Sequence, residues 1–356
     1  MKISVLAYEQ PDPEGTAAGR ALWAWCEGML SLGHCLKAWS WYPIPPRRSL
    51  PQWCDWHPVG TDKLWRAHLR GLAYPRHDSA RLGWQPPGDA VAVADDVPSF
   101  AAVAPASRSV VTIHYRAMAD ARALREIRPA WIQTARAERR ADRQAALVLS
   151  LSERAGRKLK HPARFVPIAY PMPQAPLDLV EEPTAGLIAD WSWKPNQKAL
   201  DILLGLWPDV HEKVPSAKLV LAGRNLEKMS IGTMSGVTVL GEVGTALEVL
   251  TRCALVAFPC PATSGPKVKV LEALAHGVCV ATTPAGIEGI VLDRPGSVGV
   301  ALQSGFADLL AGLLVSPEKR AEMGAAGRAS VLAHHGPVPA ALTRLELFNQ
   351  TFGAGI

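Results

Sequence analysis

Short apolar runs alternate with amphipathic stretches through the first half of the chain. Between the first two runs, apolar residues recur at helical spacing over 19–32, and Gly33 ends the predicted helix. This rhythm is typical of a parallel sheet that carries helices on both faces. The strands that the pattern predicts are Lys2–Leu6, Cys35–Ser40, Ala90–Ala94, Val110–His114, Leu147–Leu151 and Phe165–Ile168.

Two stretches interrupt this alternation. From Trp41 to Pro58 the chain is rich in Pro, Trp and Arg without any period, which predicts a loop that faces a groove or a partner. Between residues 167 and 183, repeated prolines break any regular element and predict an interdomain linker.

A second alternation follows the linker. It predicts strands at Leu187–Ala189, Lys218–Ala222, Leu255–Phe258 and Val278–Ala281, and helices at Lys198–Lys213, Ala246–Cys253 and Val268–His276. From Ser304 onward the pattern is helical, with an interruption near Gly336-Pro337. The sequence therefore predicts an α/β chain with an N-terminal domain over 1–172, a C-terminal domain over 173–335, and a last helix over 336–356 that returns to the first domain.

Length and composition agree with two domains. At 356 residues the chain is longer than one hydrophobic core usually supports, and its 48% apolar residues are enough to fill two cores. Apolar runs such as Leu255–Phe258 are far shorter than the roughly 20 residues that cross a bilayer. The first eight residues resemble a strand rather than a secretory signal, so we expect a cytoplasmic protein.

The cysteine spacing and the net charge limit the classes of ligand that we expect the protein to bind. The six cysteines form no CxxC pair and lack the spacing of a zinc site, so we expect reduced thiols. No DxD-like pair of acidic residues stands in the loop after Phe258, so we expect no bound metal, and we expect no cofactor. The net charge of +6 fits anionic ligands such as nucleoside diphosphates, or peripheral contact with an anionic membrane surface. Because that charge is dispersed and no recognition motif accompanies it, nucleic acid is not an expected partner.

Candidate chemistry concentrates between Phe258 and Ile290. A buried strand ends at Phe258, and after a loop a helix begins near Gly265–Val268, where unpaired backbone N–H groups attract phosphate. Lys267 and Lys269 can add positive charge beside a diphosphate, and Glu272 offers a carboxylate to paired hydroxyls such as a ribose edge. We therefore expect a nucleotide site at this loop.

This segment also carries a family resemblance. The run Lys269-Val-Leu-Glu-Ala-Leu-Ala-x-Gly277, followed by a Val-rich strand and Thr-Thr-Pro-x-Gly286, resembles the donor-site signature of family 4 retaining glycosyltransferases. Further blocks resemble that family in order and spacing: Trp193-x-Pro195-Asn196-x-x-Ala199, Leu219–Arg224 and Val237–Val243 in the second half, and Gly15–Leu22, Gly33-His34, Val110–His114 and Leu149–Ser152 in the first.

The resemblance implies a GT-B fold, in which two Rossmann-like domains face each other across a cleft, with the donor nucleotide sugar on the C-terminal one. It implies that Glu272 holds the ribose, that Gly241–Val243 touches the base, that Lys198 binds the diphosphate, and that His114 lies near the transferred sugar. The predicted catalytic residues are His114, Lys198 and Lys269. The predicted donor-binding residues are Gly15, Gly19, Lys194, Gly223, Arg224, Gly241, Glu242, Val243, Ser264, Gly265, Lys267, Val270 and Glu272.

Two positions depart from the family pattern. Ser264 stands where a glutamate is expected eight residues before Glu272, and no arginine precedes Lys198. We expect Lys194, Lys267 or Lys269 to supply the missing charge. Lys198 is also predicted to begin its helix, where the dipole disfavours a cation and an anion contact would offset this.

The predicted function is transfer of a hexosyl group from a nucleoside diphosphate sugar to a hydroxyl of a small molecule or glycan, in bacterial envelope or natural-product biosynthesis. The alternatives are a nucleotide-sugar epimerase or hydrolase of the same fold, and a catalytically silent binding subunit. Asp95-Asp96 and Glu9 are the carboxylates that the first alternative would use.

Two further groups of side chains have both structural and functional interpretations. Arginines 136, 139, 140 and 143 alternate with Glu138 and Asp142, which predicts a solvated helix face with near-neighbour ion pairs, or a contact with a membrane or acidic acceptor. The tryptophans at 39, 41, 53 and 56 suit either core packing or stacking on sugar rings.

Overall fold

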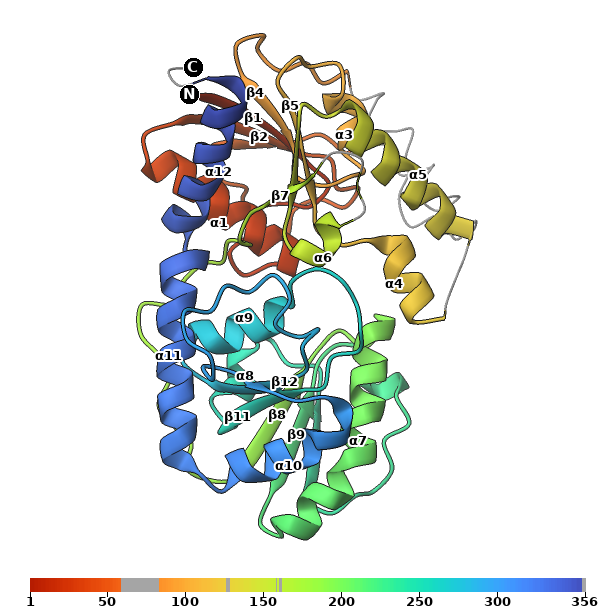
Figure 1. The fold of residues 1–356 in the computed structure, drawn as a ribbon, viewed down its shortest axis with the longest axis vertical. Coiled ribbons are helices and arrows are strands. Elements are labelled where there is room, and N and C mark those ends of the chain that lie inside the picture. Colours follow the sequence, from red (N-terminus) through yellow and green to blue (C-terminus); the bar gives the residue numbers. More distant parts are fainter. Residues whose placement is uncertain (59–82, 126–128, 158, 160–161, 354–356) are drawn as a thin grey trace. The chain divides into compact units, whose positions relative to one another are not determined.

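The computed structural model describes residues 1–58, 83–125, 129–157, 159 and 162–353 (Figure 1). The chain divides into two compact units. The first consists of Met1–Pro171, Ser264–Pro266 and His334–Ile356, and the second of Met172–Thr263 and Lys267–Ala333. Each unit is built around one parallel sheet.

The sheet of the first unit has seven strands among the described residues, in the order β3-β2-β1-β4-β5-β6-β7. Every pairing in it is parallel. Its central strands β1, β4 and β5 are buried almost throughout, as the continuous apolar runs of their sequences require. The strands are β1 (Lys2–Ala7), β2 (Cys35–Ser40), β3 (Cys54–Trp56), β4 (Val91–Ala94), β5 (Ser109–Ile113), β6 (Leu147–Ser150) and β7 (Arg164–Phe165).

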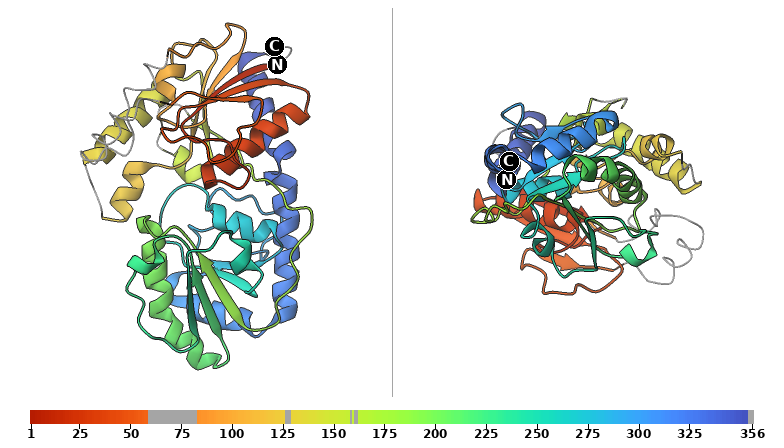
Figure 2. Two further views of the ribbon diagram at one scale, coloured as in Figure 1. Left: turned by 180° about the vertical axis from the view of Figure 1, so that it is seen from behind. Right: turned by 90° about the horizontal axis from the view of Figure 1, so that it is seen from below.

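Two helices of the first unit that are far apart in sequence lie side by side, namely α1 (Ala17–Ser31) and α12 (Pro337–Phe352), as Figures 1 and 2 show. The start of α1 is capped by Thr16, whose hydroxyl accepts from the Gly19 N–H at 3.0 Å. A Cβ at Gly28 would lie 2.0 Å from the Pro337 carbonyl oxygen, so the close packing requires glycine there. The unit's other helices are α3 (Phe100–Val103), α4 (Ala117–Ala123), α5 (Pro129–Gln144) and α6 (Glu153–Gly156).

The sheet of the second unit has six strands in the described chain, all parallel, in the order β10-β9-β8-β11-β12-β13. The order reverses between β8 and β11, and ligands bind beyond the carboxyl ends of strands at such a switch point. The elements are β8 (Thr184–Ile188), α7 (Lys194–Lys213), β9 (Lys218–Ala222), the 3-10 helix η2 (Leu226–Lys228), β10 (Val237–Gly241), α8 (Leu247–Leu250), β11 (Leu255–Phe258), α9 (Val268–Ala275), β12 (Cys279–Thr282), β13 (Gly299–Val300), α10 (Gln303–Leu314) and α11 (Pro317–His335).

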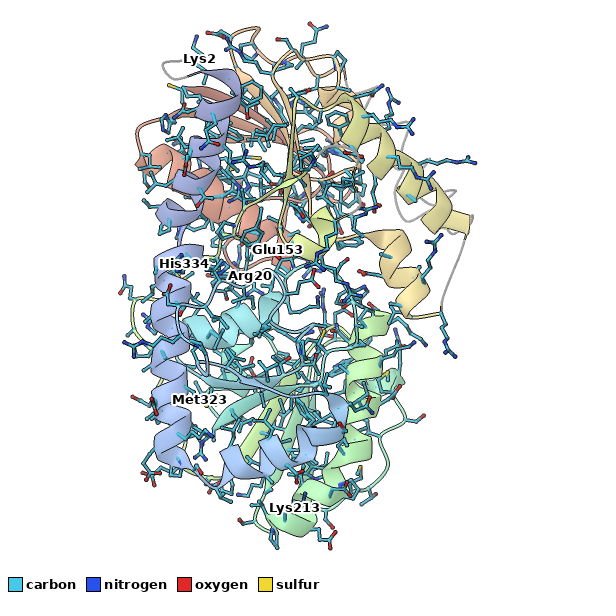
Figure 3. All side chains as sticks on the ribbon, viewed as in Figure 1. Lys2, Arg20, Glu153, Lys213, Met323 and His334 are labelled. Carbon is cyan, nitrogen blue, oxygen red and sulfur yellow. The ribbon has the colours of Figure 1, made fainter. Side chains whose placement is uncertain are left out.

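On the surface of the second unit, an exposed ion pair joins α7 to α10. Lys213, which Figure 3 labels, contacts Asp308, and both side chains are largely in solvent. Within the described ranges, no helix combines the length and the apolar character that crossing a bilayer demands.

Several predicted elements differ from the observed ones. The predicted loop 41–58 contains β3, a strand too short to show a period, and only Phe165 of the predicted strand 165–168 is in β7. The predicted helix 246–253 is helical only at Leu247–Leu250. The prediction that a helix begins at Lys198 is wrong, because α7 begins at Lys194 with Pro195 in its first turn, where proline is tolerated.

The predicted solvated face of α5 is also wrong for its acidic residues. Glu138 and Asp142 are 2% and 4% exposed, so they face the interior rather than solvent. Glu138 instead pairs with Arg116, whose Nε lies 3.0 Å from Oε2. Of the tryptophans at 39, 41, 53 and 56, Trp41 is fully buried, and its indole N–H donates to Ser99 Oγ at 2.8 Å.

Candidate functional site

The start of α9 holds a lysine in unusual surroundings. The Lys269 ammonium donates to Asn196 Oδ1 at 2.5 Å and lies 4.2 Å from the centre of the Phe258 ring. Both of these partners are neutral. Burial lowers the pKa of Lys269 to about 8, the charge of Lys267 acts in the same direction, and Glu272 opposes them. An ammonium group that is partly buried and whose pKa is depressed in this way gains from a nearby anion.

The rest of α9 supplies the other predicted residues of this segment. Lys267 is the N-cap residue and is buried at 4% exposure, while Glu272 lies partly exposed three positions after Lys269, on the same helix face. Val270 is fully buried, and its N–H donates to the Lys267 carbonyl at 2.9 Å. The side chain of Val270 therefore packs in the core.

Asn196 connects Lys269 to the loop after β8. Its Nδ2 donates to the Asp190 carbonyl oxygen at 2.7 Å, so the amide is oriented with its oxygen toward Lys269. Burial raises the pKa of Asp190, but hydrogen bonds from Ser192 and the charge of Arg224, 3.1 Å away, outweigh it and hold the pKa below its usual value. The ionised Asp190 loop thus supports the amide that contacts Lys269.

The loops after β9 and β10 lie at the same edge of the sheet. Gly223 has φ +122°, and a Cβ there would lie 1.9 Å from the Ala189 carbonyl oxygen. The Gly223 N–H donates to the Gly241 carbonyl at 2.7 Å, which ties these two predicted glycines together. Beyond Gly241, Glu242 is exposed and Val243 is half-buried. The carboxyl ends of four adjacent strands thus carry predicted site residues.

The two predicted lysines of α7 stand in its first turns. Lys194 is exposed and Lys198 is half-buried. Asn196, between them, was not among the predicted site residues, although it belongs to the Trp193-x-Pro195-Asn196 block. Its presence in that block, one turn into a helix that follows a central strand, was the signal that could have found it.

In the first unit, His114 follows β5 and faces the end of β4. Its Nε2 lies 3.7 Å from Asp95 Oδ2, and its side chain is 22% exposed. Burial lowers the pKa of His114, with Asp96 opposing, and burial raises the pKa of Asp95 to about 7. The imidazole is therefore held near a carboxyl group that titrates around neutrality.

The Gly15–Gly19 segment is a tight turn before α1. The Gly15 N–H donates to the Asp12 carbonyl at 3.1 Å, and a Cβ at Gly19 would lie 2.5 Å from the Gln10 carbonyl oxygen. The turn also contacts Glu9, whose carboxylate accepts from the Thr16 hydroxyl at 3.0 Å. Backbone packing after β1 thus explains Gly19, whereas a Cβ at Gly15 would lie 2.8 Å from the Asp12 side chain.

Ser264 and Gly265 group with the first unit. The Ser264 N–H donates to Asp120 Oδ1 at 2.7 Å, and its hydroxyl accepts from the Arg116 N–H at 2.8 Å. Gly265 has φ +79°, and a Cβ there would lie 2.3 Å from the His114 carbonyl oxygen. Asp120 therefore occupies one backbone N–H of the loop that we expected to bind phosphate.

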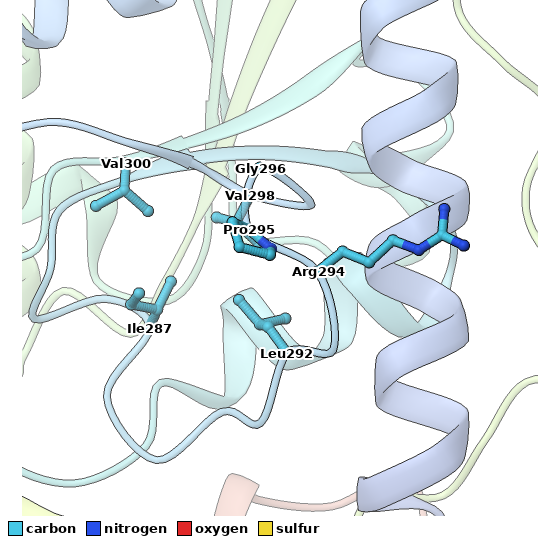
Figure 4. A pocket seen from close by; sticks show the side chains of 7 residues that line it. All are labelled: Ile287, Leu292, Arg294, Pro295, Gly296, Val298 and Val300. Carbon is cyan, nitrogen blue, oxygen red and sulfur yellow. The ribbon is translucent and has the colours of Figure 1, made fainter.

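A separate hollow of about 490 Å³ in the second unit is lined by the connection between β12 and β13 and by β13 (Figure 4). Figure 4 shows aliphatic side chains around it and Arg294 extending away. None of its lining residues is a predicted site residue; they are Ile287, Leu292, Arg294, Pro295, Gly296, Val298 and Val300.

Comparison with known proteins identifies the second unit. The model of the family Glycosyl transferases group 1 matches residues 182–328, which span β8 to α11 and include Lys269, Asn196 and Glu272. No curated protein sequence matches the chain.

Solved structures match over the full length. The chain is similar to a TarM mutant from S. aureus in complex with Fondaparinux, alpha-GlcNAc-glycerol and UDP (TM-score 0.72, 11% identity, 98% of this chain and 99% of that chain). It is also similar to sucrose-phosphate synthase from Thermosynechococcus elongatus (0.73, 14%, 100% and 100%) and to Anabaena HepE in complex with UDP-glucose (0.67, 13%, 98% and 100%). At these identities the likeness establishes the fold, and it confirms the predicted GT-B architecture.

The predicted enzyme class is confirmed as well, through the family match. Family 4 membership and the roles of the single site residues stay predictions. Residues 182–328 match the Glycosyl transferases group 1 model, and the protein is a glycosyltransferase with the GT-B fold of two Rossmann-like domains.

Proposed function

We propose that the protein transfers a hexosyl group from a nucleoside diphosphate sugar to a hydroxyl acceptor, with retention of anomeric configuration and without a metal ion. The observation that carries this proposal is the Lys269 ammonium, held at the start of α9 by a neutral amide and a neutral ring. A diphosphate beside it would supply the anion that these partners do not.

In this mechanism the protein stabilises the charge that develops on the departing diphosphate. The bond from the anomeric carbon to the phosphate oxygen breaks while the acceptor oxygen bonds to that carbon from the same face, and the acceptor proton passes to the leaving phosphate. Lys269 is fixed before the reaction by Asn196, so little reorganisation accompanies charge development. Lys267 and Lys198 add positive charge, Glu272 binds the ribose, and His114 contacts the transferred sugar.

A uridine nucleotide is the donor to test first. HepE was solved with UDP-glucose and TarM with UDP and a glycosylated glycerol. By analogy we propose a cytoplasmic enzyme whose acceptor is a small molecule or glycan of envelope or natural-product biosynthesis.

The proposal is tested by thermal shift with UDP, GDP and TDP, followed by a transfer assay. One nucleotide should raise the melting temperature of the wild type, because ligand binding to the native state stabilises it. Lys269→Met should abolish that rise, whereas the exposed control Lys319→Met should retain it. If no nucleotide stabilises the wild type, or if Lys269→Met responds like the wild type, the donor site is not at α9.

An acceptor-free incubation separates transfer from the alternative of epimerisation or hydrolysis. We expect slow consumption of the nucleotide sugar without acceptor and rapid consumption with one. Fast turnover without acceptor would favour the epimerase or hydrolase, and tight nucleotide binding without any turnover would favour a silent subunit.

We also propose peripheral contact with an anionic membrane through α5. Arg136, Arg139, Arg140 and Arg143 are exposed at spacings of three and four residues, and the acidic residues of the helix are buried instead of screening them. Each arginine near an anionic surface contributes about 1 kcal/mol. The wild-type protein should sediment with phosphatidylglycerol vesicles, and a variant with all four arginines replaced by glutamine should stay in the supernatant. If the variant sediments like the wild type, the membrane contact is contradicted.

A further inference from the structure

A network of side chains links His114 to the interior of the first unit. It contains His114, Asp95, Trp25 and Arg344, which come from four different parts of the unit. Trp25 of α1 donates its indole N–H to Asp95 Oδ1 at 2.9 Å, and Asp95 Oδ2 lies 3.7 Å from His114 Nε2. Arg344 of α12 stands over the Trp25 ring, with Cζ 5.5 Å from the ring centre. The network therefore connects α12, through α1, to the residues that follow β4 and β5.

Three residues of this network are almost inaccessible to solvent. Trp25, Asp95 and Arg344 are 2%, 5% and 3% exposed. The guanidinium of Arg344 is fixed by donating to the Pro167 carbonyl at 3.2 Å and to the Ala340 carbonyl at 3.0 Å. Burying a guanidinium and a carboxyl group costs stability unless each has partners, so a charged pair at this place calls for a reason beyond packing.

Other charged groups also face the pair. The charge of Asp96 acts on both Asp95 and His114, and the Asp96 carboxylate accepts from the Tyr8 N–H at 2.7 Å and the Ser99 N–H at 2.8 Å. Asp95 reaches His114 through its backbone, which raises the His114 pKa by a hydrogen bond, and through its carboxylate 3.7 Å away. Glu9 interacts electrostatically with Asp96, and the Cys26 thiol with Asp95. Arg344 is the cation that acts on Asp95, and it opposes the rise in the Asp95 pKa that burial causes. The charge of Asp95 thus depends on Arg344.

We infer that Asp95 is the positioning residue for His114, and that Trp25 and Arg344 fix its carboxylate so that the imidazole keeps one orientation and one charge state. This inference rests on the proposed role of His114 at the transferred sugar. A neutral amide at position 95 could still accept from Trp25, but it would not bring a negative charge to His114 or a partner to Arg344. The anionic carboxylate is therefore the feature that the arrangement requires.

Asp95→Asn tests the inference, because it keeps the shape and the acceptor for Trp25. The wild-type kcat should rise with pH through about 7 as Asp95 ionises. In Asp95→Asn this rise should disappear and kcat at pH 8 should fall roughly 10- to 100-fold, with the donor KM nearly unchanged. Asp89→Asn is the control, because Asp89 is exposed and lies two residues before β4. This variant should keep the wild-type kcat and its rise with pH.

A second readout does not depend on activity. The His114 imidazole can be followed by NMR titration and assigned with a His114→Gln variant. In the wild type the ionisation of Asp95 should appear in the His114 ring signals as a step near pH 7, and this step should be absent in Asp95→Asn. An unchanged His114 titration overturns the inference even if the protein transfers no sugar, whereas an altered titration without transfer would contradict the proposed function alone.

If the Asp95→Asn variant does not fold, the same measurements can be made on Arg344→Gln. Removing the cation disfavours the anionic carboxylate, so the kcat rise should move to higher pH and the His114 titration should change with it. A profile and titration identical to the wild type in Arg344→Gln would equally overturn the inference.

Discussion

The two units handle buried charge in opposite ways. In the second unit, the hydrogen bond and the ring contact of Lys269 go to neutral groups, and its pKa is depressed to about 8. In the first unit, Asp95 and Arg344 act on each other across a shared tryptophan. A charge whose direct contacts are neutral groups indicates where a ligand will supply an opposite charge, and a buried charge with its counter-charge indicates a support for a neighbouring group.

The largest expected effect is on the Lys269 side of this comparison. Lys269→Met should lower kcat by roughly 100- to 1000-fold, equivalent to about 2–4 kcal/mol, because a donor to the leaving diphosphate is lost. The free protein should at the same time become more stable near pH 7, because a poorly compensated buried charge is gone. Steady-state kinetics and melting curves on the same preparations measure both. A variant with normal kcat would contradict the comparison.

A smaller effect tests the helix pair that carries Arg344. Gly28→Ala should destabilise the protein by about 1–3 kcal/mol, because the new Cβ would overlap the Pro337 carbonyl oxygen. Gly312→Ala is the matched control, since it also lies in a helix but has no neighbour within 4 Å, and it should stabilise by up to about 1 kcal/mol. Urea unfolding compares the two. Equal effects would mean that the α1–α12 contact is not tight.

The pH dependence of nucleotide binding separates the two sites further. Lys269 has a pKa of about 8 in the free protein, so its charge, and with it part of the nucleotide affinity, should be lost as pH rises through 8. Calorimetry at pH 7 and pH 9.5 should show an affinity loss of roughly 10-fold, about 1.4 kcal/mol. In Lys269→Arg the affinity should stay level, because arginine keeps its charge. A loss of equal size in both proteins would assign it to another group.

The same depressed pKa predicts a stability profile. The native pKa of Lys269 lies below the unfolded value of 10.5, so its contribution to stability is fully present above pH 10.5 and is lost as pH falls through about 8. The stability advantage of Lys269→Met over the wild type should therefore be larger at pH 7 than at pH 10. Melting temperatures at the two pH values test this, and an advantage that grows with pH would contradict it.

The smallest effect is expected at the surface. Lys213→Ala removes the exposed ion pair with Asp308, and solvent screens such pairs. The melting temperature and kcat should stay within error of the wild type. A clear loss of stability would show that charge at the surface of the second unit matters more than the comparison allows.

The sequence predicted the parts of the fold that repeat locally. The apolar runs were long enough to reveal β1, β4, β5, β9 and β11, and the spacing after Phe258 revealed α9. It failed where the signal was short or ambiguous. The three residues of β3 show no period, and the predicted helix began only at Lys198, so the first turn of α7, which contains Pro195, was missed.

The sequence proposed glycines and lysines next to strand ends as site residues, and their roles stay predictions. What joins these residues could not be predicted. Asn196 and Lys269 are 73 positions apart, and they meet because β8 and β11 are neighbours in the sheet. Trp25 and Asp95 are 70 positions apart, and Arg344 comes from the far end of the chain. Strand order and helix return determine these contacts, and neither is encoded in a local pattern.

The most direct test is a crystal structure of the protein with a uridine diphosphate sugar. The account predicts that a diphosphate oxygen lies about 2.7–2.9 Å from the Lys269 Nζ, the distance of a charge-assisted hydrogen bond. A diphosphate bound elsewhere, or a Lys269 whose contacts to Asn196 and Phe258 are unchanged with no phosphate beside it, would contradict the central claim.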